Sequence, residues 1–295
     1  MSQHTDRTAA PDDAPVDEPK PIVYGVAGAL SPMVRRIVAD NAGHMTGPGT
    51  NTYLVGIDEI AVIDPGPGDD AHLDAIAGCG GDRIRWILLT HTHADHSPGA
   101  VGLKKRTGAE VLAFGPGEGR GKVRLDGTLG DKAVIEATEF HLTALHTPGH
   151  ASNHLCYLLN EERTLFTGDH VMQGSTVVIS PPDGDMAAYL ASLERIKTLR
   201  PRLKAIAPGH GHLITDPVAA VDEIIGHRLA REAQVLDLVQ AHGSVEIGAL
   251  VDEIYPDLVE PLVPMARRTV WAHLRKLADE GSVKGDDPDR AWSAT

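Results

Sequence analysis

Four side chains of the kinds that bind metal ions occur within six consecutive positions of this chain. The stretch THTHADH at residues 90–96 holds His91, His93, Asp95 and His96, and it follows the apolar run IRWILLT at 84–90, which is typical of a strand. A strand that ends in a loop directs successive side chains into one pocket. Crowding and burying imidazoles and a carboxylate there would cost free energy through desolvation and through repulsion between groups of like charge. A divalent cation removes both costs. The stretch therefore predicts a metal site.

The alternative for this stretch is a histidine-rich loop that faces solvent, and three later segments argue against it. TPGH at 147–150, GDH at 168–170 and PGHGH at 208–212 each follow a predicted strand. Each also sets a ligand-type residue beside glycine, where the backbone can turn tightly and approach an ion closely. We expect all four segments to lie at strand ends.

The rest of the chain from residue 22 alternates predicted strands with predicted helices. This alternation is typical of α/β architecture. The expected helices cover residues 70–77, 98–107 and 186–199. The expected strands are TYLVG at 52–56, IAVID at 60–64, IRWILLT at 84–90, EVLAF at 110–114, HLCYLL at 154–159 and TLFTGD at 164–169.

The pattern changes after Pro217, where apolar residues recur at helical spacing for about six turns. Gly243 ends this long helix, and two more helices are expected at 245–254 and 263–280 before a short polar hairpin. That outline is typical of a winged-helix-like unit. We expect a disordered tail over residues 1–20, which are poor in large apolar residues, a catalytic domain over 21–217 and a helical domain over 218–295.

In their order along the chain, THTHADH, TPGH, GD and GH resemble the motif series of the metallo-β-lactamase fold superfamily. The resemblance implies a four-layer αββα sandwich followed by the small winged-helix-like domain. It also implies a pair of divalent cations. One would be held by His91, His93 and His150, the other by Asp95, His96 and His210, with Asp169 bridging them.

Three further segments are similar to the lactamase-β-like protein 2 subgroup: TGPGTNTYLV at 46–55, DPGPG at 64–68 and HRLAREAQVL at 227–236. Some members of that subgroup are endoribonucleases, and many bacterial members are recognised only as hydrolases. The resemblance implies hydrolysis by a hydroxide shared between two metal ions. Asp95 would orient that hydroxide and receive its proton. No GXSXG nucleophile motif occurs in the chain.

Residues next to the predicted ligands are expected to orient them. Asp64 is the first candidate, and its alternative is an ordinary turn residue before Pro65. His154 and His170 would either donate a proton to a leaving group or be hydrogen-bonded core or rim histidines. The glycine-containing loop at 46–51 would either line the cleft with backbone amides or simply connect two elements.

Charge leaves two substrate classes open. The net charge of -14 repels polyanions, while the resemblance favours single-stranded RNA. Residues 263–295 carry six Lys or Arg and five Asp or Glu, a net of +1, which is not the footprint of a nucleic-acid surface. The second class is a small-molecule thioester, lactone or lactam, with the C-terminal helices walling the cleft or forming a homodimer contact. A third reading is an inactive metal-binding regulatory protein.

Zinc is the first choice for the cations, and manganese or iron would also suit imidazole and carboxylate ligands. Cys79 and Cys156 lie in unlike contexts and are expected to be free thiols. The N-terminal residues lack the apolar stretch of a secretory signal, and no apolar run is long enough to span a bilayer. We therefore expect a cytoplasmic protein without a membrane role, and abundant Ala, Gly and Arg are typical of a GC-rich bacterial genome.

Overall fold

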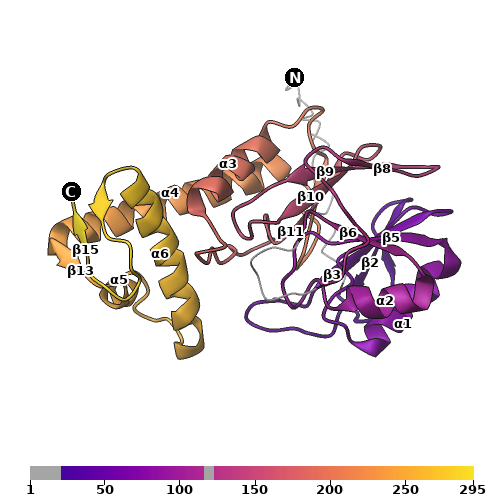
Figure 1. Ribbon diagram of the computed structural model, residues 1–295, viewed down its shortest axis with the longest axis horizontal. Helices are drawn as coiled ribbons and strands as arrows, with labels where there is room; N and C mark the ends of the chain where they lie inside the picture. Colours follow the sequence, from indigo (N-terminus) through magenta and orange to yellow (C-terminus); the bar gives the residue numbers. More distant parts are fainter. Residues whose placement is uncertain (1–20, 116–122) are drawn as a thin grey trace, which may run out of the picture.

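The computed structural model describes residues 21–115 and 123–295. The predicted tail at residues 1–20 lies outside the described residues. Two sheets stack face to face in the catalytic part, and a helical unit with a small sheet of its own extends to one side, drawn in yellow in Figure 1.

The first sheet has seven strands that follow one another in sequence order. Its first strands pair antiparallel, and its last strands pair parallel from β4 onward. Helices that cross back over the sheet allow this parallel pairing. The strands are β1 (Gly28–Ala29), β2 (Val34–Val38), β3 (Asn51–Val55), β4 (Ile60–Ile63), β5 (Ile84–Leu88), β6 (Glu110–Ala113) and β7 (Gly127–Thr128).

The second sheet has five strands in the order β12-β11-β10-β9-β8. Its neighbours pair antiparallel except β11 and β12, which run parallel because helix α3 (Met186–Lys197) connects them. The strands are β8 (Val134–Glu136), β9 (His141–His146), β10 (Leu155–Leu159), β11 (Thr164–Gly168) and β12 (Ala205–Pro208).

Three hydrophobic cores separate four layers, as the αββα arrangement requires. The central core joins the two sheets and contains Phe140, Tyr157 and Phe166. An outer core lies between the first sheet and helices α1 (Asp70–Gly80) and α2 (Gly99–Thr107). The other outer core lies between the second sheet and helices α3 and α4 (Pro217–His242). The predicted four-layer fold is confirmed.

Side-chain caps fix where the helices begin. The carboxylates of Asp69, Asp185 and Asp216 accept hydrogen bonds from backbone N–H groups of α1, α3 and α4, respectively. Such caps satisfy N–H groups that have no partner inside the helix. Pro217 occupies the first turn of α4, where its missing N–H costs nothing, and Gly243 ends the helix at a φ of 70°.

Helix α4 contributes to two cores. Its first half gives Val221 and Ile224 to the core over the second sheet. Its second half gives Val235 and Val239 to a fourth core in the C-terminal unit. That unit also contains the short helix η2 (Glu260–Leu262), α5 (Ile247–Ile254), α6 (Val263–Asp279) and the strands β13 (Ser244–Val245), β14 (Val283–Lys284) and β15 (Trp292–Ala294).

The predicted strands and helices appear where the sequence placed them, with ends shifted by a few residues. Strands β1, β2, β7 and β8 were not among the expected runs; β1, β7 and β8 have only two or three residues, and β2, VRRIV, carries two arginines in five residues. The boundary placed after residue 217 stays a prediction, since α4 continues through it into both cores. Among the described residues, the helices are too short or too polar to cross a bilayer.

Phe140 provides a test of the central core. Its ring is 0% exposed and meets Trp86 edge-on, with the ring centroids 6.4 Å apart. We expect Phe140→Ala to lower the free energy of unfolding by about 3–5 kcal/mol, because it leaves a cavity between the sheets. Phe114→Ala, at a half-buried ring that stacks on His146, should cost clearly less. Urea denaturation measures both, and equal losses would contradict this placement of the core.

Candidate metal centre

The four predicted segments do come together at strand ends. His91, His93, Asp95 and His96 follow β5, and His150 lies between β9 and β10. Asp169 follows β11 and His210 follows β12. Because the two sheets pack face to face, loops from both reach the same edge of the sandwich. The seven side chains form two groups there, each with ligand atoms within 4.8 Å of one another.

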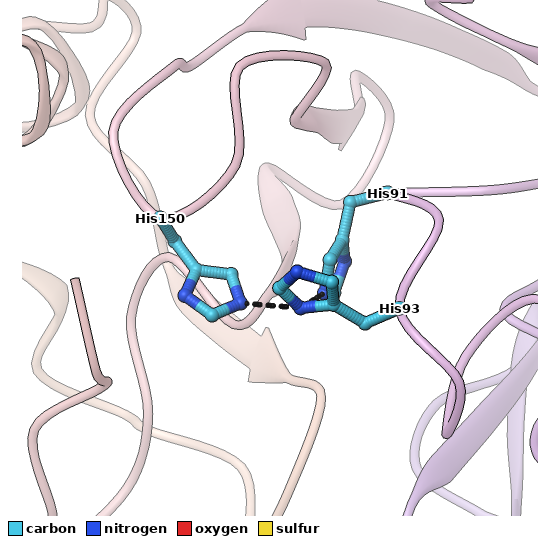
Figure 2. Close-up of side chains that lie close together, drawn as sticks. All are labelled: His91, His93 and His150. Atoms are coloured by element: carbon cyan, nitrogen blue, oxygen red, sulfur yellow. Dashed lines mark hydrogen bonds between the residues drawn. The ribbon is translucent and has the colours of Figure 1, made fainter. Parts of the chain in front are cut away.

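The three-histidine group consists of His91, His93 and His150, whose rings turn toward one another in Figure 2. The Nδ1 atom of His93 lies 3.0 Å from Nε2 of His91 and 2.9 Å from Nε2 of His150. Ligands at about 2.1 Å from a tetrahedral ion lie about 3.4 Å apart. The three nitrogens are therefore near the spacing that one cation requires.

The mixed group consists of Asp95, His96, Asp169 and His210. The Nε2 atoms of His96 and His210 each lie 3.3 Å from Oδ2 of Asp95. The same atoms lie 3.2 and 3.3 Å from Oδ1 of Asp169. Two imidazoles and two carboxylates thus face a common point.

Asp169 lies between the groups. Its Oδ1 atom faces the mixed group, and its Oδ2 atom lies 3.7 Å from Nε2 of His150 in the three-histidine group. A carboxylate with its two oxygens turned toward different ligand sets is placed to contact two ions.

Glycines beside the ligands keep the centre open. A Cβ on Gly209 would lie 2.7 Å from Oδ1 of Asp169 and 2.8 Å from Cε1 of His96. A Cβ on Gly168 would lie 2.5 Å from Oγ1 of Thr90, and Gly168 also has a φ of 46°. The glycines of the GD and GH segments are therefore required by space at this site.

The residues fit a pair of divalent cations. Among the described residues, three buried ligand-type atoms of the mixed group lie near one another but form no well-aligned hydrogen bond: Nε2 of His96, Nε2 of His210 and Oδ1 of Asp169. Buried polar atoms are rarely left unsatisfied. Nitrogen and oxygen ligands of this kind suit zinc, manganese and iron, so the donor set does not choose among them.

A network of hydrogen bonds orients the ligand rings. Asp64 accepts from Nδ1 of His96 at 2.9 Å, and its two oxygens accept from the backbone N–H and the hydroxyl of Thr90 at 2.8 and 2.7 Å. Asp64 holds a left-handed φ of 51°, a costly conformation for a residue other than glycine. The structure thus brings this predicted orienting residue against a ligand.

Backbone carbonyls orient two other rings. Nδ1 of His210 donates to the carbonyl of Gly49 at 3.1 Å, and Nδ1 of His150 donates to that of Val178 at 2.8 Å. The loop at 46–51 therefore supports His210 through a carbonyl oxygen, where the sequence suggested amides or a plain connection. Thr90, Gly49 and Val178 were not predicted, and only Thr90, which opens the THTHADH stretch, carried a signal.

His154 and His170 lie behind the ligands, fully buried. The ring of His154 is 5.1 Å from that of His91, and its Nδ1 lies 3.0 Å from the hydroxyl of Thr147. Both ring nitrogens of His170 lack a partner among the described residues. Burial lowers the pKa of His170 to about 3, so its ring is neutral. These positions fit core histidines better than rim residues.

The two groups differ in protonation. Burial, followed by repulsion from the neighbouring imidazole of His150, lowers the pKa of His93 to about 4. Burial would also lower the pKa of His210, but the carboxylates of Asp169 and Asp95, each with an oxygen 3.3 Å from its Nε2, outweigh it and raise the pKa to about 9. Three carboxylates likewise outweigh burial at His96 and raise its pKa well above the ordinary value.

The sequence also matches known protein families. A sequence profile of the metallo-beta-lactamase superfamily matches residues 45–210, more than half of the chain. The chain belongs to this superfamily. A profile of the beta-lactamase associated winged helix domain matches residues 247–292. The C-terminal unit of this hydrolase therefore matches a known domain family.

Known proteins align with this chain over most of its length. The beta-lactamase-like protein 2 homolog of Drosophila melanogaster is 34% identical, covering 86% of this chain and 91% of that protein. A protein of Aspergillus chevalieri named atrochrysone carboxyl ACP thioesterase is 33% identical, covering 86% and 83%. A beta-lactamase domain protein from Burkholderia ambifaria has the same fold, with a TM-score of 0.82, 19% identity and coverage of 95% and 96%.

Cation uptake by the metal-free protein should release protons. At pH 7 His210, with a pKa of about 9, carries a proton that a cation must displace, whereas His93, with a pKa of about 4, does not. The apparent affinity of the mixed group should therefore rise with pH up to about 9, while that of the three-histidine group changes little above pH 5. Calorimetric zinc titrations in buffers of different ionisation enthalpy measure the release. Binding heats independent of buffer would contradict this.

Proposed function

We propose that this protein hydrolyses small-molecule thioesters at a centre of two divalent cations. The observation that carries the proposal is the placement of Asp169 between two complete ligand groups. His91, His93 and His150 would hold one cation, and Asp95, His96 and His210 the other. When bound, the cations supply Lewis acidity and lower the pKa of water.

Asp95 is placed to handle the proton of the reaction. Its side chain is 27% exposed, against 0% for His96 and 3% for His210, so it is open to an incoming water. Burial would raise the pKa of Asp95, but His96 and His210 outweigh it and lower the pKa below its ordinary value, so the group is ionised at neutral pH. Asp95 would orient the attacking water and accept its proton.

The reaction balances without a covalent enzyme intermediate. The water oxygen forms a bond to the thioester carbonyl carbon, and Asp95 takes the proton. The C–S bond then breaks, and the thiol leaves with a proton that Asp95 returns. The products are a carboxylic acid and a thiol, and no outside oxidant or reductant is needed.

A cavity of about 530 Å³ begins at Met172, three residues after Asp169, and we infer that it receives an uncharged substrate arm. It lies between α4 and the segment that follows Asp169, with Met172, Ile214 and Ile224 in its apolar wall. Among the described residues that line the cavity, Glu223 carries a fixed charge and none is Lys or Arg. A phosphodiester backbone would meet no cation there.

Thioesters are favoured over RNA by two further observations. The Aspergillus relative, which matches most of the chain, is named a thioesterase. The net charge of -14 repels polyanions, and the described part of the C-terminal unit offers no excess of cations large enough to reverse that.

The bridging assignment can be tested by counting metal ions. We expect Asp169→Ala to reduce bound zinc from about two per chain, because the carboxylate faces both groups. Elemental analysis of dialysed protein gives the ratio. Asp126→Ala is the matched control, since that carboxylate pairs with Lys104 at the surface and should leave the ratio unchanged. Unaltered stoichiometry in Asp169→Ala would refute the bridge.

The substrate class can be tested with two panels run side by side. Purified protein with zinc or manganese is given thioesters and lactones in one panel and labelled single-stranded RNA in the other. We expect thioester turnover that disappears in chelator and returns with metal. Cleavage of RNA alone would overturn the substrate class. Absence of metal-dependent turnover in both panels would overturn the hydrolytic centre itself.

A further inference from the structure

The carbonyl that orients His150 belongs to a segment fastened by the C-terminal helices. Nδ1 of His150 donates to the carbonyl of Val178 at 2.8 Å. One residue before, the carbonyl of Val177 accepts a hydrogen bond from Arg228 of α4. Three residues after, the carbonyl of Pro181 accepts from Nη1 of Arg268 of α6 at 3.1 Å. Two arginines from the helical unit thus hold both sides of the segment that supports a ligand.

Arg228 is buried in an unusual setting for a charged group. It is 2% exposed, and no carboxylate of the described residues forms an ion pair with it. Burying a charge without an opposite charge is costly unless other contacts replace the lost water. Besides the Val177 carbonyl, the guanidinium contacts the ring of Tyr189, whose centroid lies 5.5 Å from Cζ.

Tyr189 packs against the residue that precedes His150. A Cβ on Gly149 would lie 2.3 Å from Cα of Tyr189, so the backbone of α3 packs directly against the residue before His150. The hydroxyl of Tyr189 donates to the carbonyl of His170, next to Asp169. Arg228 therefore contacts the Val177 carbonyl, one residue before the carbonyl that orients His150, and the ring of Tyr189, whose backbone packs against Gly149.

We propose that Arg228 is a positioning residue of the metal centre, which sets the ring of His150 through the Val178 carbonyl and Tyr189. The helical unit then completes the three-histidine group rather than only flanking it. This inference rests on the proposed two-cation centre. It gives a role to the HRLAREAQVL segment at 227–236, which the hydrolytic chemistry itself does not use.

A purely structural role would have a different signature. If Arg228 only joined the two units, its loss would lower stability and weaken both groups alike. A positioning role predicts a selective effect, because the Val178 carbonyl contacts His150 and none of the mixed group. Loss of the partner that orients a ligand typically weakens metal binding about 10–100-fold.

The experiment is a cobalt titration of metal-free, full-length protein, followed by visible absorption. His93→Ala and His210→Ala assign the two binding steps to the three-histidine and mixed groups. We expect Arg228→Gln to weaken the three-histidine step about tenfold and to leave the other within about twofold. Arg228→Lys, which keeps the charge, should fall between Arg228→Gln and the wild type. Arg231→Gln is the matched control, since Arg231 contacts Gln234 and Tyr255 inside the helical unit.

A second pair of variants, Arg268→Ala and Arg267→Ala, separates the positioning effect from a general loss of stability. Arg268→Ala should weaken the same step less than Arg228→Gln does, and Arg267→Ala, at a 41% exposed side chain, should weaken neither. Equal weakening of both steps in Arg228→Gln and Arg268→Ala, or no weakening, would overturn the positioning role. A wild-type protein that binds a single cation would instead overturn the proposed centre, and the two failures are distinguishable.

Discussion

The placement of one carboxylate determines how this site can work. Asp169 follows β11 at the edge of the second sheet, and its two oxygens face ligand sets that come from both sheets. That geometry exists only because the sheets pack face to face and end at the same edge. The central core around Phe140, Tyr157 and Phe166 fixes their separation. The geometry of the candidate site therefore depends directly on how the two sheets pack.

Around this carboxylate, crowded imidazoles are stabilised in two different ways. In the three-histidine group, burial favours neutral rings, which are ready to donate a lone pair. In the mixed group, carboxylates balance protonated rings. Both arrangements hold nitrogen and oxygen atoms at ligand spacing.

The clustering of the predicted ligands could be foreseen from the sequence because their chemistry is carried by side chains and their spacing by strand ends. His91 to His96 lie within one loop, and glycine marks the other three segments. Asp64 could also be predicted from the sequence, since it ends a predicted strand. The roles of the Val178 and Gly49 carbonyls could not be predicted, because every residue has a carbonyl and only the tertiary fold determines which one faces a ring.

The burial of Arg228 was hidden for a related reason. The sequence shows arginine on a long amphipathic helix, where a solvated side chain is the usual outcome. What buries it is the contact of α4 with the 177–181 segment and with α3, which depends on how the two units pack. Strand β2 was missed because its two arginines interrupt the apolar run that signals a strand.

Helix α4 passes through two hydrophobic cores without a break. Because one helix contributes side chains to both cores, the two units share a continuous structural element. Recombination or truncation at the apparent border would cut through both interiors at once.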